Sequence, residues 1–326
     1  MIPYRYGKVA SFEQAAAYLA QNKSGVAVMA GGTDLLSELK EGTAAPSVVL
    51  DLTGTPGLSE IRKGPDGVSI GALTTLADLA ADADIERDYA VLHQAALSAA
   101  SPQLRNRGTV GGNLCQRPRC WYYRDAAVVC TKKGGGKCFA ENGRNSRHAI
   151  FGGGICWAVH PSDLAPALLV LDATAVLVSA KGERTVPLED FFTSPIVNVR
   201  RENILAPDEL VKEVRIPARK TGDRSAYVKF IERGAWDFAV VSAAVKATMN
   251  GAALGAVKIV CGGVGTKPWR LVAAEAALKG SRADEAAGQR AAARSLADAR
   301  PLAENGYKVD LLKVIVGRAV DALARS

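Results

Sequence analysis

The chain has 326 residues, of which 48% are hydrophobic, and it carries a formal net charge of +8. This length suggests two or three domains with a large core, which argues against a small secreted domain that depends on disulfides. No stretch approaches eighteen uninterrupted apolar residues, and residues 1–8 lack the apolar segment of a secretory signal. We therefore expect no membrane anchor and a cytoplasmic location, or a periplasmic one if a partner carries the export signal.

The first fifty residues alternate between helical and strand patterns. Residues 11–20 begin with a serine N-cap and continue with helix formers. A buried strand is predicted at 25–30, a helix at 35–40 and a second buried strand at 48–52. Between the first strand and its helix lies Gly31-Gly32-Thr33-Asp34, a turn that could approach a phosphate closely. It lacks the Rossmann and P-loop patterns, and an ordinary turn is the alternative.

A second glycine pair, Gly111-Gly112, follows the polar segment 101–108. Glycine has no Cβ, so the backbone of such a turn can come close to a ligand. Two glycine-rich turns far apart in the sequence could bind a diphosphate from both sides.

Five of the six cysteines fall within one segment of the chain: Cys115, Cys120, Cys130, Cys138 and Cys156. Their surroundings are polar and rich in glycine, which argues against ordinary core cysteines. Disulfides would be unusual in a chain of this length. Four converging thiolates could bind zinc or an iron–sulfur cluster, and the spacing, which includes no C-x-x-C, leaves both open.

The cysteine segment is also basic. Between Gln116 and His148 there are eight basic and two acidic residues, a net charge of +6. Nearby cations would stabilise a negatively charged metal–sulfur centre, although a solvated basic loop is the alternative. A zinc module that stacks nucleic-acid bases on residues 121–123 is a third interpretation. The basic excess is local, so we expect no nucleic-acid partner.

After the cysteine segment, a helix that starts near Asp163 leads to a strand at 175–178, and another strand is predicted at 211–216. The polar segment 217–223 reads as a linker between domains.

The C-terminal part has a different pattern. Residues 272–324 are rich in alanine with helical spacing, and the segment before them predicts an antiparallel sheet with strands at 226–232, 240–249 and 256–262. We expect a sheet that is covered by helices on one face.

Four segments together resemble the FAD-binding medium subunit of molybdenum hydroxylases, the xanthine dehydrogenase group: AGGTDL at 30–35, IGALTT at 70–75, residues 101–113 and PSDL at 161–164. The resemblance continues at 227–230 and 262–265 and covers essentially the whole chain. It implies an α+β protein, with a two-subdomain FAD-binding fold of the vanillyl-alcohol oxidase type and a C-terminal antiparallel sheet covered by helices. The implied parts are subdomain 1 (1–60), subdomain 2 (61–217, with an insertion at about 115–158) and a C-terminal domain (222–326).

The same resemblance assigns residues to FAD. Asp163 would hydrogen-bond the cofactor, Val211 would pack on the isoalloxazine, and Lys229 would lie near this ring, where a cation can stabilise the anionic reduced flavin. Without the resemblance, Asp163 could be a helix N-terminal residue and Lys229 a surface lysine. The implied pyrophosphate loops are Val28, Met29, Ala30, Gly31, Gly32, Thr33, Asp34 and Leu35 in the first, and Thr109, Gly111, Gly112 and Asn113 in the second.

Most medium subunits lack the cysteine insertion. Its presence resembles the aldehyde oxidoreductase branch, whose FAD subunit carries an additional [4Fe–4S] cluster. A related cluster-bearing subunit occurs in 4-hydroxybenzoyl-CoA reductase, but the spacing here is more similar to the aldehyde-oxidising branch. Cys115 directly follows the second glycine turn, so we assign it to that turn and expect the cluster ligands to be Cys120, Cys130, Cys138 and Cys156.

The resemblance implies an oxidoreductase subunit of a heterotrimer. A large molybdenum-cofactor subunit would oxidise an aldehyde, a small [2Fe–2S] subunit would pass electrons to FAD on this chain, and an external acceptor would receive them. No residue here resembles a substrate-oxidising base, so no catalytic residue is assigned. The alternatives are a medium subunit of a 4-hydroxybenzoyl-CoA reductase-like or xanthine dehydrogenase-like enzyme, and a stand-alone flavoprotein oxidase. None of the three histidines, His93, His148 and His160, lies in a recognisable flavin-tethering motif.

Overall fold

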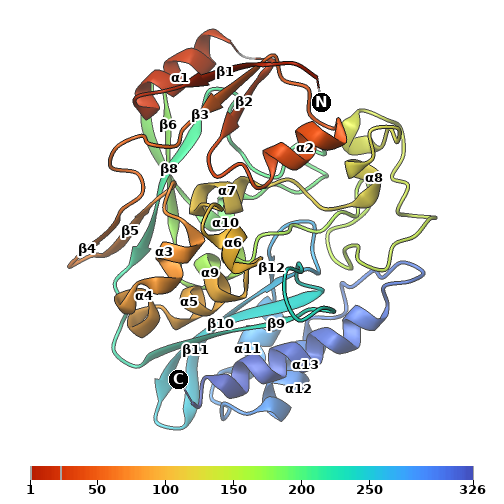
Figure 1. The fold of residues 1–326 in the computed structure, drawn as a ribbon. Coiled ribbons are helices and arrows are strands. Elements are labelled where there is room, and N and C mark those ends of the chain that lie inside the picture. The colour runs from red at the N-terminus through yellow and green to blue at the C-terminus, as the bar shows by residue number, and fades with distance from the viewer. Residues whose placement is uncertain (1, 23, 326) are drawn as a thin grey trace.

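The computed structural model describes residues 2–22 and 24–325 and contains three β-sheets (Figure 1). Within this part of the chain, no helix is long and apolar enough to cross a membrane. The first sheet is parallel, in the order β1-β3-β2, with β1 (Arg5–Lys8), β2 (Val26–Met29) and β3 (Val48–Asp51). The connecting helices α1 (Phe12–Gln21) and α2 (Leu35–Glu41) confirm the predicted alternation. β1 was not predicted, because its side chains are mostly exposed and show no apolar pattern.

The second sheet is antiparallel throughout, in the order β4-β5-β8-β6-β7. β8, the last of these strands in sequence, lies in the middle between β5 and β6, so the chain from β4 to β8 closes into one unit. The strands are β4 (Ile61–Gly64), β5 (Gly67–Gly71), β6 (Thr174–Ser179), β7 (Gly182–Pro187) and β8 (Leu210–Pro217). The helices of this part are α3 (Leu76–Ala81), α4 (Ala83–Asp88), α5 (Ala90–Ser98), α6 (Pro102–Arg105), α7 (Val110–Cys115), α9 (Leu164–Val170) and α10 (Leu188–Phe191).

The third sheet is antiparallel, in the order β12-β11-β10-β9. As predicted, helices cover one of its faces, and Figure 1 shows them below the sheet. Val241, Ala243 and Val245 of β10 pack on those helices, whereas Ala244 packs with the core of the second unit, since side chains alternate along a strand. The elements are β9 (Asp223–Phe230), β10 (Val241–Asn250), β11 (Ala253–Gly262), β12 (Trp269–Arg270), α11 (Val272–Leu278), α12 (Glu285–Arg294) and α13 (Tyr307–Ala322).

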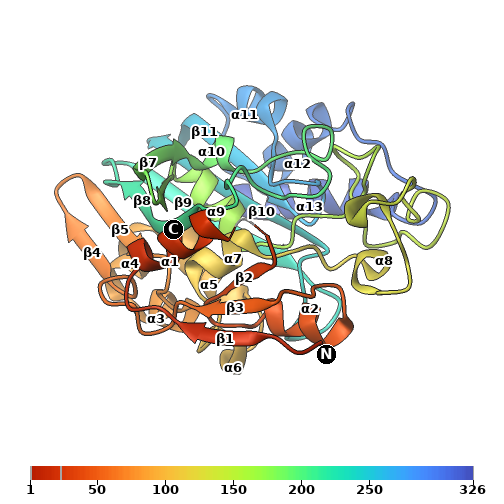
Figure 2. The same ribbon diagram turned by 90° about the horizontal axis from the view of Figure 1, so that it is seen from above.

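Residues 116–158 form the cysteine insertion, which lies at the side of the molecule beside α2 (Figure 1 and Figure 2). Its regular structure is limited to α8 (Trp121–Arg124) and one 3-10 turn, Thr131–Lys133. The polar, glycine-rich sequence of this segment thus folds with little regular structure. Its returning end is attached to the chain before α13, where Asn145 and Glu304 exchange two hydrogen bonds of 2.8 and 2.9 Å.

Candidate functional site

The turn between β2 and α2 comes very close to the chain that precedes α7. A Cβ at Gly31 would lie 1.7 Å from the carbonyl oxygen of Arg107, so only glycine fits there. Gly32 has φ +74°, in the left-handed region that favours glycine. The first glycine turn, residues 30–34, therefore lies against the segment that leads into the second.

The second glycine turn, residues 109–113, is the start of α7. Thr109 is its N-cap, and its hydroxyl accepts a hydrogen bond of 3.2 Å from the Gly112 amide. The side-chain oxygen of Asn113 accepts a hydrogen bond of 2.5 Å from the Ser162 hydroxyl. This contact joins the second turn to the chain just before α9.

A cavity of about 560 Å³ opens between the two glycine turns, a size typical of ligand and cofactor sites. Gly111 and Val211 lie in the wall of an adjoining cavity of about 320 Å³, and the two cavities share Cys115 and Arg117. The other predicted cofactor-binding residues, except Lys229, line the larger cavity: Val28, Met29, Ala30, Gly31, Gly32, Thr33, Asp34, Leu35, Thr109, Gly112, Asn113 and Asp163. The structure thus brings nearly all of these residues to one connected space.

Asp163 and Lys229 form a buried ion pair beside this cavity. The ammonium of Lys229 lies 2.8 Å from one carboxylate oxygen of Asp163 and donates to the Ser98 carbonyl at 3.0 Å. The Tyr227 hydroxyl donates to the other carboxylate oxygen at 2.9 Å. Burial raises the pKa of the Asp163 carboxyl, against the opposing effect of the Lys229 charge. Lys229 lines neither cavity, so its ammonium lies behind Asp163, and its contact with the isoalloxazine stays a prediction.

The loop between β9 and β10 also lines the larger cavity and was missed from the sequence. It contributes Arg233, Trp236, Asp237 and Phe238. Trp236 has φ +55°, which is strained for a bulky residue, and 64% of its surface is exposed. The Arg119 guanidinium lies 4.8 Å from the centre of the Phe238 ring, a cation–π contact between this loop and the cysteine insertion. In the sequence, the one feature that could have indicated this loop is a pair of aromatic residues between two predicted strands.

Asp34 binds the cysteine insertion and does not cap its own helix α2. Its carboxylate accepts hydrogen bonds of 2.7 Å from the Arg124 guanidinium and from the backbone amide of Arg117. It also forms an ion pair of 2.8 Å with Arg119. The insertion is therefore attached directly to the end of the first glycine turn.

Two further carboxylates hold the insertion. Glu38 of α2 accepts a hydrogen bond of 2.6 Å from the Tyr123 hydroxyl, and burial raises the pKa of Glu38. Buried Glu202 forms ion pairs with both Arg117 and Lys132. Most of the basic residues of the insertion thus pair with carboxylates outside it: Arg117, Arg119, Arg124, Lys132 and Arg147. The cations that we expected to stabilise a metal–sulfur centre serve largely to attach the insertion.

The predicted ligands Cys120, Cys130, Cys138 and Cys156 are all free thiols. Cys120 interacts electrostatically with Cys138 and Cys130, and Cys138 shares a hydrogen bond with Cys156. That hydrogen bond, helped by backbone N–H groups, lowers the pKa of Cys138 to about 6, whereas burial raises the pKa of Cys120 to about 11. Within residues 2–22 and 24–325, no group of three or more His, Cys, Asp or Glu side chains is placed so that it could hold a metal ion.

Buried polar atoms without partners are concentrated in and just beyond this segment. Of six such side-chain atoms in the described residues, four are ring nitrogens of Trp121, His148, Trp157 and His160. Trp121 and Trp157 directly follow Cys120 and Cys156 in sequence. A buried N–H without an acceptor costs about 1–3 kcal/mol, and the sulfurs of an iron–sulfur cluster accept such hydrogen bonds. The indole N–H groups of Trp121 and Trp157 are donors that the sulfurs of a metal–sulfur centre on these cysteines would satisfy.

The other two cysteines lie elsewhere. Cys115, at the end of α7, lines both cavities at the glycine turns, and burial raises its pKa to about 12. Cys261 is fully buried in β11, in the core of the C-terminal sheet. Both positions agree with a ligand set that excludes these residues.

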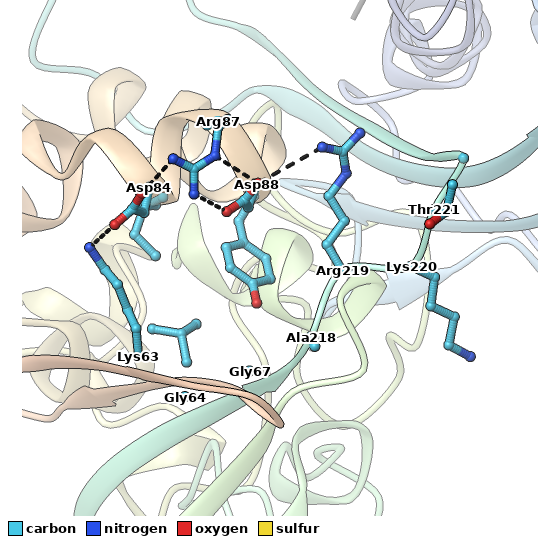
Figure 3. Close-up of a pocket in the computed structure, with 14 residues that line it drawn as sticks. Lys63, Gly64, Gly67, Asp84, Arg87, Asp88, Ala218, Arg219, Lys220 and Thr221 are labelled. Carbon is cyan, nitrogen blue, oxygen red and sulfur yellow. Dashed lines mark hydrogen bonds and ion pairs between the residues drawn. The ribbon is translucent and has the colours of Figure 1, made fainter.

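Another cavity, of about 550 Å³, lies between the β4–β5 hairpin, α4 and the chain before β9 (Figure 3). Its charged residues pair with one another: Asp84 binds both Lys63 and Arg87, and Asp88 binds Arg87 at 2.5 Å and Arg219 at 3.9 Å. These pairs leave little charge for a ligand, and no sequence motif falls here. We therefore place the functional site at the glycine turns.

Comparison with known families and proteins gives a consistent result. The family described as "FAD binding domain in molybdopterin dehydrogenase" matches residues 2–219, and "CO dehydrogenase flavoprotein C-terminal domain" matches residues 226–323. The chain is 39% identical over 303 residues to the aldehyde oxidoreductase FAD-binding subunit PaoB of Escherichia coli, covering 91% of each chain. It is 28% identical over 329 residues to the carbon monoxide dehydrogenase medium chain of Hydrogenophaga pseudoflava, covering 99% of this chain and 98% of that one.

Solved structures agree on the fold. A chain of carbon monoxide dehydrogenase from Hydrogenophaga pseudoflava superposes with a TM-score of 0.78 at 28% identity, covering 100% of this chain and 99% of that one. A chain of quinoline 2-oxidoreductase from Pseudomonas putida 86 gives a TM-score of 0.77 at 23% identity and supports the fold alone. The predicted FAD-binding fold with a C-terminal antiparallel sheet is thereby confirmed.

A methyl group at Gly31 should weaken FAD binding. Gly31→Ala forces the first glycine turn away from the Arg107 carbonyl, and overpacking of this kind costs about 1–3 kcal/mol, so we expect FAD affinity to fall roughly tenfold. FAD per chain after purification and titration of the apoprotein with FAD measure the effect. Gly64→Ala is the control, because nothing lies within 4 Å of a Cβ there. Equal FAD affinity in the two variants would contradict the importance of this contact.

Loss of the Lys229 charge should destabilise the protein. Lys229→Met leaves the buried Asp163 carboxylate without its cation, which typically costs about 3–5 kcal/mol. Urea unfolding of the full chain measures this loss. Lys258→Met is the matched control, since Lys258 pairs with the half-exposed Asp172, and we expect a cost of about 0–1 kcal/mol. Similar losses of unfolding free energy in both variants would show that the Asp163–Lys229 pair contributes no more to stability than the Lys258–Asp172 pair.

Proposed function

Because the chain belongs to the FAD-binding medium subunits of the molybdenum hydroxylase family, we propose that it is the FAD and [4Fe–4S] subunit of a molybdenum-dependent aldehyde oxidoreductase. The chain would work in a heterotrimer with a large molybdenum-cofactor subunit and a small [2Fe–2S] subunit. It would take electrons from the small subunit onto its FAD and pass them to an external acceptor.

Sequence similarity supports the aldehyde-oxidising assignment. The chain shares 39% identity with an aldehyde oxidoreductase FAD-binding subunit over nine-tenths of both chains. Identity to a carbon monoxide dehydrogenase medium chain is 28%, and to a nicotine 6-hydroxylase medium subunit 29%. Since aldehyde oxidation would occur on the large subunit, this chain needs no substrate-oxidising base of its own.

The geometry of the cavity supports a role of the two glycine turns in binding FAD. FAD, when bound, supplies reversible electron acceptance next to the protein's own charged groups. Residues 30–34 and 109–113 would hold its pyrophosphate, since glycine lets their amides approach closely. Asp163, held in place by Tyr227 and Lys229, would accept a hydrogen bond from the cofactor. The buried cation behind Asp163 would oppose the effect of burial and favour the ionised carboxylate, which can only accept hydrogen bonds.

The cysteine insertion supports the additional cluster. The four free thiols interact with one another in pairs, the tryptophans that directly follow two of them have buried indole N–H groups without a partner, and one thiol has a pKa lowered to about 6. Cys120, Cys130, Cys138 and Cys156 would hold the cluster, which would supply one-electron transfer close to the flavin cavity. Zinc would also accept four thiolates, and metal analysis separates the two.

Serine substitutions test the cluster. We expect about four irons and one FAD per purified chain, with a visible spectrum that combines flavin and iron–sulfur absorption. Replacing Cys120, Cys130, Cys138 or Cys156 with serine should remove the iron in each case and leave FAD bound, because none of these residues lines the flavin cavity.

Cys115→Ser and Cys261→Ser are the controls for these variants and should keep full iron. Zinc in place of iron would reject the cluster. Iron loss in Cys115→Ser, together with iron retention in one of the four, would reassign the ligand set. Aldehyde oxidation by the isolated chain at the rate of the complex would reject the proposed division of labour.

A further inference from the structure

His148 makes the one hydrogen-bonding contact between a histidine and a thiol that is recorded in the described residues. Its Nε2 lies 3.2 Å from the sulfur of Cys120. The imidazole is 2% exposed and packs edge-on against Trp121, with the ring centres 4.9 Å apart. The contact therefore lies inside the insertion, shielded from water.

Hydrogen bonds hold the backbone of His148. Its amide donates to the Asn145 carbonyl at 2.9 Å, and its own carbonyl accepts a hydrogen bond of 3.1 Å from the side chain of Asn305. The other ring nitrogen, Nδ1, is buried and has no partner in the described residues. In the described residues, the Cys120 sulfur is thus the one recorded hydrogen-bond partner of the imidazole nitrogens.

The chemistry of a metal-ligating cysteine determines which atom donates the hydrogen bond in this contact. A cysteine that ligates a metal is a thiolate, which can only accept a hydrogen bond. The Nε2 of His148 must then carry the proton and donate it, leaving a lone pair on Nδ1. A hydrogen bond to a ligand sulfur withdraws negative charge and stabilises the reduced form of an iron–sulfur centre more than the oxidised form.

We infer that His148 is a positioning and tuning residue that donates its Nε2–H to the Cys120 ligand and raises the reduction potential of the proposed cluster. The inference rests on the proposed [4Fe–4S] cluster and deepens it. It makes His148 a partner of the ligand and not itself a ligand, so iron should stay bound without the imidazole.

The test compares variants of the full chain within its complex. In His148→Leu we expect unchanged iron and FAD content and a more negative cluster potential, measured by redox titration monitored by electron paramagnetic resonance. The reduced-to-oxidised ratio at a fixed potential should fall about tenfold, equivalent to 59 mV for a one-electron couple. His148→Gln keeps an N–H donor and should recover part of the shift.

Asn305→Ala is the matched control. It removes the hydrogen bonds to the carbonyls of His148 and Ala149 and so perturbs the local backbone, but it keeps the imidazole side chain itself. We expect its cluster potential to stay near that of the unaltered protein. An equal shift in Asn305→Ala and His148→Leu would reduce the role of His148 to local packing.

The remaining outcomes separate this inference from the proposed function. An unchanged potential in His148→Leu, with iron present, overturns the inference and leaves the cluster. Loss of iron in His148→Leu but not in Asn305→Ala would make His148 a ligand and also overturn it. Absence of iron from the unaltered protein overturns both.

Discussion

The carboxylate of Asp34 fixes where the cysteine insertion lies relative to the flavin cavity. It ends the first glycine turn and accepts hydrogen bonds from the insertion at Arg117 and Arg124, with Arg119 as an ion-pair partner. A hydrogen bond to a charged group contributes more than one between neutral groups, and this carboxylate is only 18% exposed. Since both chain segments meet at one side chain, the glycine turn and the insertion cannot move independently.

Buried charge is balanced in the same way at two other points. Glu202 pairs with both Arg117 and Lys132, and Asp163 pairs with Lys229. Pairs of this kind contribute little net stability over an apolar pair, but breaking one is costly because the remaining charge stays buried. They therefore act mainly as constraints on geometry. Both sets of ion pairs connect separate parts of the structure. Glu202 connects the insertion to the second sheet unit, and Asp163 connects the wall of the cavity to the C-terminal sheet.

The sequence predicts those features that depend on local chemistry. The glycine pairs at Gly31 and Gly111 indicate close backbone approach, and the apolar runs of β10 and β11 indicate a buried sheet, so the fold and the glycine turns could be predicted. Features that depend on distant partners could not. The loop with Trp236 lines the cavity only because β9 and β10 bring it there. The burial of Lys229 depends on Ser98 and Asp163, 131 and 66 residues away.

The anchors of the insertion do not involve its thiols, and this bears on what a cluster would do. Asp34, Glu38 and Glu202 hold one end, while Glu304 and Asn305 hold the other, all through oxygen and nitrogen atoms. A cluster is therefore not needed to attach the insertion to the flavin domain.

Both ends of the insertion also lead directly to the flavin cavity. Gln116 and Pro161 line that cavity. A fully extended chain spans at most about 14 Å over the four residues from Gln116 to Cys120, and about 18 Å over the five from Cys156 to Pro161. A cluster on these cysteines, as proposed above, would therefore be confined by the chain itself to the neighbourhood of that cavity. The two proposed sites are linked by short stretches of chain, and the insertion that joins them is anchored by oxygen and nitrogen contacts alone.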